Sequence, residues 1–172
     1  MKRVLQTAVI LLFLLTLCAC NLSEEELREK AIDQLNQNSD LPFPLALPEN
    51  ELGDISAYQR IDGYGCWGLE DADATITISG YPDCLDAYHV TDIRFRTTRY
   101  SVFGVRIGDI AKDAVERLKS EGYVRVPDTS DLAYTKDGVV IRLEYSDTEG
   151  RQLTVSVLTV YLLTTNVEDV NF

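Results

Sequence analysis

The chain has 172 residues, which is about the length of one domain. Its 28 acidic residues outnumber its 16 basic residues, and the formal net charge is −12. Because so acidic a surface repels phosphate backbones and anionic lipid headgroups, we expect neither nucleic-acid binding nor an electrostatic contact with a membrane.

The first twenty residues have the pattern of a secretory signal. A positively charged start at residues 1–3 is followed by an apolar run over residues 4–17, and a small residue, Ala19, comes directly before Cys20. The ending Leu17-Cys18-Ala19-Cys20 resembles the lipobox of bacterial lipoproteins. This resemblance implies cleavage before Cys20, acylation of that cysteine with fatty acids such as palmitate, and a lipid anchor on the extracytoplasmic face of the cell membrane.

Two other interpretations of this segment stay open: an ordinary cleaved signal and an uncleaved membrane-spanning helix. A span needs roughly 20 apolar residues, whereas the apolar run here is shorter and is interrupted by Gln6. One acyl chain holds a protein on a bilayer only marginally. The resemblance implies two or three chains, which would make the anchor at Cys20 stable.

We expect three parts in the chain. Residues 1–19 are the signal peptide, residues 20–54 carry the lipidated N-terminus, a short helix and a proline-containing connector, and residues 55–172 form an α+β domain. The fold class is an antiparallel sheet with one main packed helix, plus the short N-terminal helix. Removal of the signal takes away Lys2 and Arg3, so the net charge of the mature chain is −14.

The residues after the expected cleavage site predict a helix and then an extended connector. Ser23 and Glu26 have the spacing of a capping box, and apolar residues follow at helical spacing. These apolar residues are Leu27, Ala31, Ile32 and Leu35. Three prolines interrupt residues 42–48, yet apolar residues alternate over residues 41–47. We therefore expect part of the connector to dock on the domain.

From residue 55 onward the sequence predicts mainly strands. The expected strands are residues 55–64, 75–79, 88–98, 123–126 or 132–135, 139–145 and 153–163. Asp109 as the N-cap and Gly122 as a left-handed C-cap bound the main helix, and Asp137-Gly138 predicts a tight hairpin. The last strand has apolar residues on both faces. This predicts cover on both sides, by the helix on one and by the connector or a partner on the other.

Residues 75–163 resemble a recurrent unit of envelope proteins. The segment Phe103-Gly104-Val105-Arg106-Ile107-Gly108-Asp109 leads into an amphipathic helix that ends near Glu121-Gly122-Tyr123, and a three-stranded meander follows. Small outer-membrane assembly lipoproteins of the SmpA/OmlA type and β-lactamase-inhibitor-like domains share this scheme, although the former usually place their helices before the sheet. With Ile78-Ser79-Gly80-Tyr81-Pro82-Asp83 before it, the unit is also similar to uncharacterised lipoproteins of Gram-positive anaerobes. The resemblance implies a binding or scaffold protein and no catalytic residue.

After processing, Cys66 and Cys84 remain in addition to Cys20. In an oxidising compartment such a pair favours a disulfide, which would contribute about 3 kcal/mol in the chain-entropy model. Two buried free thiols are the alternative. We expect no metal and no cofactor, because two cysteines and the single histidine, His89, lack the spacing of metal ligands, and the acidic clusters lack that of a calcium loop.

The sequence predicts a lipid-anchored, non-catalytic envelope protein that binds another envelope protein or an envelope polymer. No nucleophile elbow, phosphate loop or dinucleotide-binding fingerprint is present in the sequence. The alternative is a small envelope hydrolase or thiol enzyme that uses Cys84 and His89. A disulfide at Cys84 would exclude the thiol mechanism.

The expected binding rim consists of Trp67, Tyr81 and Tyr88. Trp67 lies in a glycine-rich stretch that indicates a loop, where the ring either packs over the disulfide or serves as an exposed recognition aromatic. Tyrosine suits a recognition surface because its large apolar body carries a polar tip. The sequence identifies neither the partner nor the oligomeric state.

Overall fold

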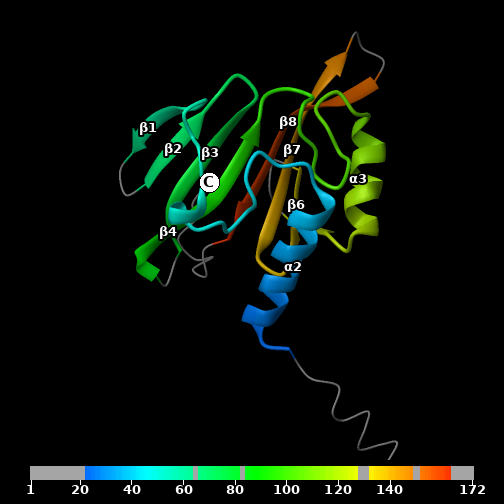
Figure 1. The fold of residues 1–172 in the computed structure, drawn as a ribbon. Helices are drawn as coiled ribbons and strands as arrows, with labels where there is room; N and C mark the ends of the chain where they lie inside the picture. Colours follow the sequence, from blue (N-terminus) through cyan, green and yellow to red (C-terminus); the bar gives the residue numbers. More distant parts are fainter. Residues whose placement is uncertain (1–21, 64–65, 82–83, 128–131, 149–151, 164–172) are drawn as a thin grey trace, which may run out of the picture.

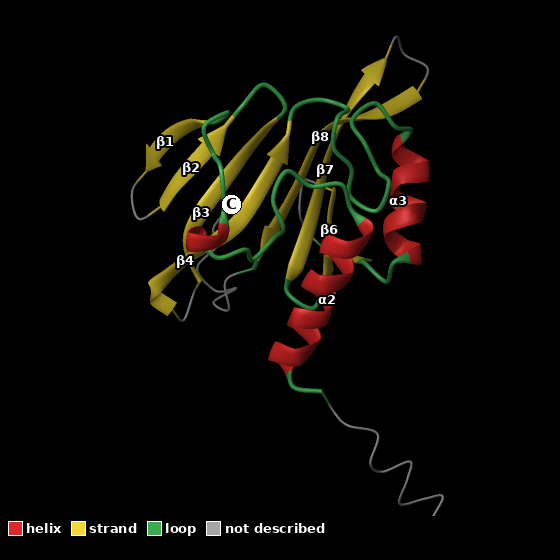
Figure 2. Ribbon diagram, viewed as in Figure 1, coloured by secondary structure: helices red, strands yellow, loops and turns green. Residues whose placement is uncertain are grey.

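The computed structural model describes residues 22–63, 66–81, 84–127, 132–148 and 152–163. In this part of the chain, eight antiparallel strands form one sheet that two α-helices accompany, which confirms the α+β class (Figure 1). The sheet dominates the fold, as Figure 2 shows. The elements in chain order are α2 (Glu24–Asn38), the 3-10 helix η1 (Glu49–Glu51), β1 (Gln59–Gly63), β2 (Cys66–Glu70), β3 (Ala74–Tyr81), β4 (Cys84–Phe95), α3 (Ala111–Ser120), β5 (Val124–Arg125), β6 (Leu132–Lys136), β7 (Val139–Thr148) and β8 (Gln152–Leu162).

The strand order across the sheet is β1-β2-β3-β4-β8-β7-β6-β5. Strands β1 to β4 are sequential neighbours, and so are β5 to β8, with β4 and β8 meeting in the middle. The chain passes from one half to the other through the segment that contains α3. The two edges of the sheet are therefore β1 and β5.

The two faces of the sheet differ in polarity because side chains alternate along each strand. On β3, Ala74, Ile76 and Ile78 are fully buried, whereas Thr75 and Thr77 between them are only half-buried. We call the face that carries Ile76 the inner face and the opposite one the outer face. The helices and the connector lie against the inner face, where their apolar side chains join those of the sheet in one core (Figure 1).

Helix α2 begins as the sequence predicts. The Glu26 amide donates to the Ser23 hydroxyl at 3.2 Å and the Ser23 amide donates to the Glu26 carboxylate at 2.7 Å, which completes a capping box. Ala31, Ile32 and Leu35 are buried, so the apolar stripe packs on the domain. The N-terminal helix, which we expected to be short, is the longer of the two, because α2 has 15 residues and α3 has 10. None of the helices in the described ranges has the length and hydrophobicity to cross a membrane.

The connector docks on the domain beside β4 and adds apolar side chains to the core, which confirms the prediction from its alternating apolar residues. Phe43 and Leu45 are buried. The Ala46 amide donates to the Val90 carbonyl at 2.8 Å, and the Val90 amide donates to the Leu47 carbonyl at 2.9 Å. These two bonds tie the connector to β4 and set the position of η1, which follows directly.

Helix α3 differs from the prediction at its start. It begins at Ala111 after Ile110, which makes no side-chain cap bond, so the assignment of Asp109 as the N-cap is wrong. The Asp109 carboxylate instead accepts a hydrogen bond from the Arg106 amide at 3.1 Å and closes the loop before the helix. The other end agrees with the prediction, because Gly122 adopts a φ of 88° directly after Glu121, the residue that follows the helix.

Most strands lie where the sequence predicts them, with different ends. β1 occupies only Gln59–Gly63 of the expected residues 55–64, and β4 begins at Cys84 rather than at Tyr88. Both alternatives for the strand after α3 are present, as the two-residue β5 and as β6. Strand β2 is unexpected, because the glycines around Trp67 indicate a loop.

The turn between β6 and β7 is the tight hairpin that Asp137-Gly138 predicts. The two residues have φ values of 46° and 82°, and a type I′ turn needs positive φ at both positions. The hairpin also packs close to α2, since a Cβ on Gly138 would lie 2.7 Å from Nε of Arg28, whose flexible side chain would then have to move. The turn therefore serves both the hairpin and the contact with the helix.

The apolar pattern of β8 predicts that the helix covers one face of the strand and the connector covers the other. The structure does not show this arrangement. A register shift against β7 at Glu144/Tyr145 changes the alternation of side chains, so Val155, Leu158 and Val160 all lie buried in the core. Helix and connector cover the same, inner face. The β-bulge explains why Val155 and Leu158 share the inner face although they are three residues apart, whereas Val157 and Tyr161 stay half-buried on the other face.

Candidate functional site

Trp67 lies inside β2, opposite Asp62 of β1 and Ile78 of β3. This register puts the indole on the inner face, where the residue is only 7% exposed. Strand pairing rather than a turn therefore sets its position, which corrects the expectation of a loop tryptophan. Burial leaves little of the ring free to act as an exposed recognition aromatic.

An exposed arginine lies over the indole. The Arg60 guanidinium carbon is 4.2 Å from the centroid of the Trp67 ring, within cation–π range. Its Nε donates to Oδ1 of Asp62 at 3.0 Å, and the two side chains are 57% and 79% exposed. Exposed ion pairs contribute only about 0–1 kcal/mol. A ligand can therefore displace Arg60 from this arrangement at small cost.

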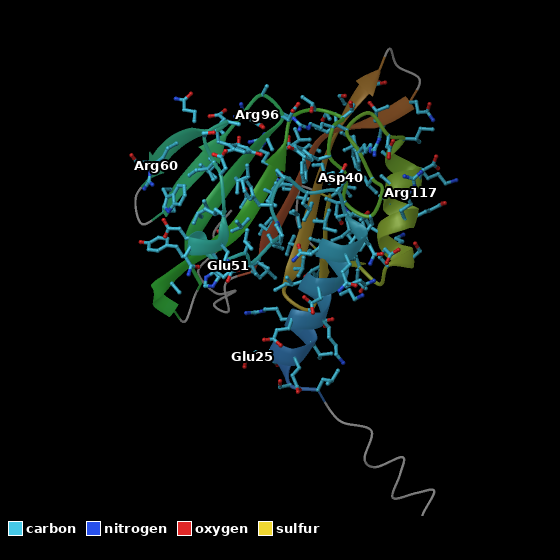
Figure 3. The ribbon with its side chains drawn as sticks, viewed as in Figure 1. Glu25, Asp40, Glu51, Arg60, Arg96 and Arg117 are labelled. Atoms are coloured by element: carbon cyan, nitrogen blue, oxygen red, sulfur yellow. The ribbon has the colours of Figure 1, made fainter. Side chains whose placement is uncertain are left out.

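These side chains border a hollow of about 320 Å³ at the β1 edge of the sheet, which we call the Trp67 hollow. Figure 3 shows Arg60 at this edge. Two of the three expected rim residues, Trp67 and Tyr88, line the hollow together, and the side chain of the third, Tyr81, lies outside the described residues. The complete lining is Glu49, Arg60, Asp62, Gly63, Cys66, Trp67 and Tyr88.

The prediction from sequence missed the charged lining residues. A correct prediction of strand β2 would have identified Asp62 and Arg60 as lining residues. The β1–β2 pairing aligns Asp62 with Trp67, and Arg60, two residues before Asp62, lies on the same face of β1. Glu49 has no comparable local signal. Hydrogen bonds to β4 fix the position of the connector. Glu49 reaches the hollow because η1 begins directly after the connector, with Pro48 as its N-cap.

The lining of the Trp67 hollow combines apolar ring surface with hydrogen-bonding groups. Glu49 and Asp62 supply carboxylate acceptors, and Arg60 supplies up to five N–H donors. Trp67 and Tyr88 add aromatic surface with polar tips. This set fits a polar ligand with some apolar surface, such as a sugar ring or a short peptide segment.

Cys66 is half-buried, lines the Trp67 hollow and carries a free thiol. The structure does not contain the favoured disulfide with Cys84: Cys66 pairs with Ser79 and Cys84 pairs with Tyr81, so β3 separates the two cysteine-bearing strands. Strands two places apart are roughly 9–10 Å apart, beyond the limit of about 7 Å between the Cα atoms of a disulfide. The side chain of Cys84 itself lies outside the described residues.

His89 lies within β4 rather than at the start of a strand, and it forms a β-bridge with Pro48 of the connector. The alternative centre of Cys84 and His89 involves a side chain outside the described residues, so it stays a prediction. Within the described ranges, no three side chains of His, Cys, Asp or Glu are grouped to hold a metal ion.

A second hollow, of about 580 Å³, lies where β3, β4 and β8 adjoin. It is lined by Thr75, Asp92, Arg94, Phe95, Arg96, Ser156 and Val157. Burial raises the pKa of the Asp92 carboxyl group to about 6, against the opposing effect of the Arg94 and Arg142 guanidinium groups. Both arginines also lie near Glu144, at 4.0 and 3.6 Å. They are therefore shared with a second carboxylate and neutralise Asp92 only in part.

Comparisons of the chain with protein-family models, curated proteins and solved structures find no match. The geometry of the described residues therefore indicates where the protein binds a ligand. The Trp67 hollow is the main candidate site, because it brings together residues from the connector, β1, β2 and β4.

Replacement of Asp92 by asparagine should stabilise the protein at neutral pH. Folding raises the pKa of this carboxyl group from 3.8 to about 6. The native state therefore binds the proton more tightly than the unfolded state, and stability falls as the pH rises through this interval. We expect Asp92→Asn to raise the free energy of unfolding by roughly 3 kcal/mol above about pH 7 and to change it little below about pH 4.

Urea unfolding at a series of pH values measures this difference. Glu116→Gln is the matched control, since Glu116 is an exposed carboxylate on α3, and it should leave the pH profile unchanged. A profile for Asp92→Asn that runs parallel to that of the unsubstituted protein would contradict the raised pKa of Asp92.

Proposed function

We propose that this protein is a lipid-anchored, non-catalytic protein of the cell envelope, which binds another envelope protein or an envelope polymer in the Trp67 hollow. The observation that carries the proposal is the convergence of Trp67 and Tyr88 with charged side chains of both signs. These residues come from segments that are distant in the chain. A surface hollow that is assembled from several segments and lined by apolar and polar groups is typical of a ligand-binding site. This favours binding over catalysis by a short sequence motif.

The anchor rests on the lipobox-like ending at Cys20. Helix α2 begins at Glu24, so the folded body would follow a lipidated Cys20 after a very short spacer, and the three glutamates of its first turn would be repelled by an anionic membrane surface. In Figure 3, Glu25 lies at the lower end of α2, whereas Arg60 lies at the left edge of the sheet, well away from it. A membrane near the start of α2 would thus leave the Trp67 hollow accessible.

The lining favours a ligand with hydroxyl, amide or cationic groups. Glu49 and Asp62 would accept hydrogen bonds from such groups, and their negative charges exceed the single positive charge of Arg60. Displacement of Arg60 from the Trp67 ring would open aromatic surface for a sugar ring or an apolar side chain. Envelope glycans and peptide segments both carry these groups.

Intact-mass analysis of the protein from its own host tests the anchor. We expect a chain that begins at Cys20 and carries the mass of two or three fatty acyl chains. Cys20→Ser removes the acylated atom and should leave the leader attached and the added mass absent. A native product that retains its leader, or that begins at another residue without lipid mass, would contradict the proposed anchor.

Substitution of Glu49 tests the binding site, because this exposed side chain lines the hollow and contributes nothing to the core. Glu49→Ala should reduce capture of the partner about tenfold, as expected for loss of one charged contact of roughly 1.4 kcal/mol. The measurements are co-sedimentation with purified cell-wall polymer and quantitative co-purification of envelope proteins from detergent-extracted membranes. The first detects a polymer ligand and the second a protein ligand.

Glu51→Ala is the matched control, because Glu51 is an equally exposed glutamate of η1 that does not line the hollow. Both variants should keep the melting temperature of the unsubstituted protein. Trp67→Ala is a poorer test, since removal of a buried ring costs roughly 3–5 kcal/mol of stability. Equal capture by the Glu49 and Glu51 variants in both assays would contradict binding in the Trp67 hollow.

A further inference from the structure

Strand β1 forms one edge of the sheet, and all five of its residues, Gln59–Gly63, are exposed (Figure 1). One side of its backbone pairs with β2. The opposite edge, β5, has only two residues, and so short an edge strand offers little backbone to a further strand. Of the two edges, β1 is therefore the better place for pairing with another chain.

The charges of β1 are complementary to themselves. Ile61 lies at the centre, with Arg60 before it and Asp62 after it. In an antiparallel pair centred on Ile61, Arg60 of each copy lies directly opposite Asp62 of the other, so the same ion pair forms twice. Natural edge strands usually carry charges that repel a further strand, lysine above all. The charges of β1 would instead attract a second copy.

We infer that β1 pairs antiparallel with β1 of a second copy, across a two-fold axis at Ile61, and that this contact joins the two sheets edge to edge. A two-fold contact is self-complementary and closes at the dimer. The backbone amide and carbonyl groups on the side of β1 that pairs with no other strand among the described residues supply the hydrogen bonds, as in other cases of strand addition. The two ion pairs set the register.

Side chains support this register on both faces of the strand. Arg60 and Asp62 share the inner face and already lie 3.0 Å apart. A second copy would turn this exposed ion pair into a group of four alternating charges. Ile61 lies on the outer face opposite Gly68, which has no side chain to cover it, and is 38% exposed. Ile61 of the second copy would supply the apolar cross-strand neighbour that Gly68 does not.

The dimer should be weak in solution. A contact through one five-residue strand is smaller than a stable protein–protein interface, which buries about 1,200–2,000 Å². Two copies held in one membrane would have a much higher effective concentration and would pair more completely. This second statement rests on the proposed lipid anchor, whereas the pairing of the strands does not.

The pairing would also bring two binding sites together. Arg60, Asp62 and Gly63 of β1 line the Trp67 hollow, so the hollows of the two copies would be neighbours across the strand contact. A ligand with repeating units could occupy both hollows and gain affinity from the second one.

Cysteines placed on β1 test the register in the full chain, in a background in which Cys18, Cys20, Cys66 and Cys84 are all replaced by serine, so that the introduced cysteine is the chain's single thiol. Ile61→Cys puts two thiols directly opposite each other, at the Cα separation of about 5 Å that a disulfide accepts. Gln59→Cys is the matched control, because residue 59 would lie opposite Gly63 of the second copy and roughly 13 Å along the strands from its own counterpart. Mild oxidation of the purified protein in detergent should give several-fold more covalent dimer for Ile61→Cys.

Charge reversal in the Ile61→Cys protein tests the ion pairs. Asp62→Arg places like charges opposite each other and should lower the yield of covalent dimer several-fold. The double change Arg60→Asp with Asp62→Arg restores opposite charges and should restore the yield. Melting curves by circular dichroism establish that each variant is folded.

Equal yields from cysteines at positions 61 and 59 would overturn the inference, because random collision would then explain the covalent dimer. A folded double variant with as little dimer as Asp62→Arg alone would overturn it as well. Neither readout involves the ligand of the Trp67 hollow. Failure of the pairing is therefore distinguishable from failure of the proposed function, which the Glu49 and Glu51 variants test.

Discussion

The structure depends on one constraint: the apolar inner face of the sheet must be covered, and near β4 the connector covers it. Phe43 and Leu45 are buried there, and two backbone hydrogen bonds join the connector to Val90. Burial of each large apolar side chain contributes roughly 1.5–3 kcal/mol. The connector is therefore part of the folded body. Because η1 follows at once, this docking also carries Glu49 to the Trp67 hollow.

Because the inner face must be covered, its centre and its margin differ in what they can bind. The centre of the inner face is a closed core, and the Trp67 hollow lies at its margin, where β1 is the outermost strand. There the buried Trp67 ring meets the exposed Arg60 and Asp62 side chains, whose ion pair costs little to open. Near β8, burial instead isolates the Asp92 carboxyl group and raises its pKa to about 6. We therefore expect ligand binding at the margin of the sheet. We expect the stability of the protein to depend on pH through Asp92, at the junction of β4 and β8.

Local signals in the sequence predicted local structure well. The capping box at Ser23, the alternation along β3 and the hairpin at Asp137-Gly138 each follow from chemistry within a few residues. The errors arose where tertiary contacts decide. Trp67 lies in a strand because β1 and β3 flank it, despite its neighbouring glycines. Glu49 could not be predicted as a site residue, because its position depends on hydrogen bonds between the connector and β4.

Native-state amide hydrogen exchange tests the docking of the connector most directly. The Ala46 and Val90 amides each donate across the junction between the connector and β4. If the connector is part of the folded body, both amides should exchange only through global unfolding, with the same free energy as the most protected amides of β4 and β8. Fast exchange at Ala46, while those central amides stay protected, would show that the connector opens independently and would contradict a preformed Trp67 hollow.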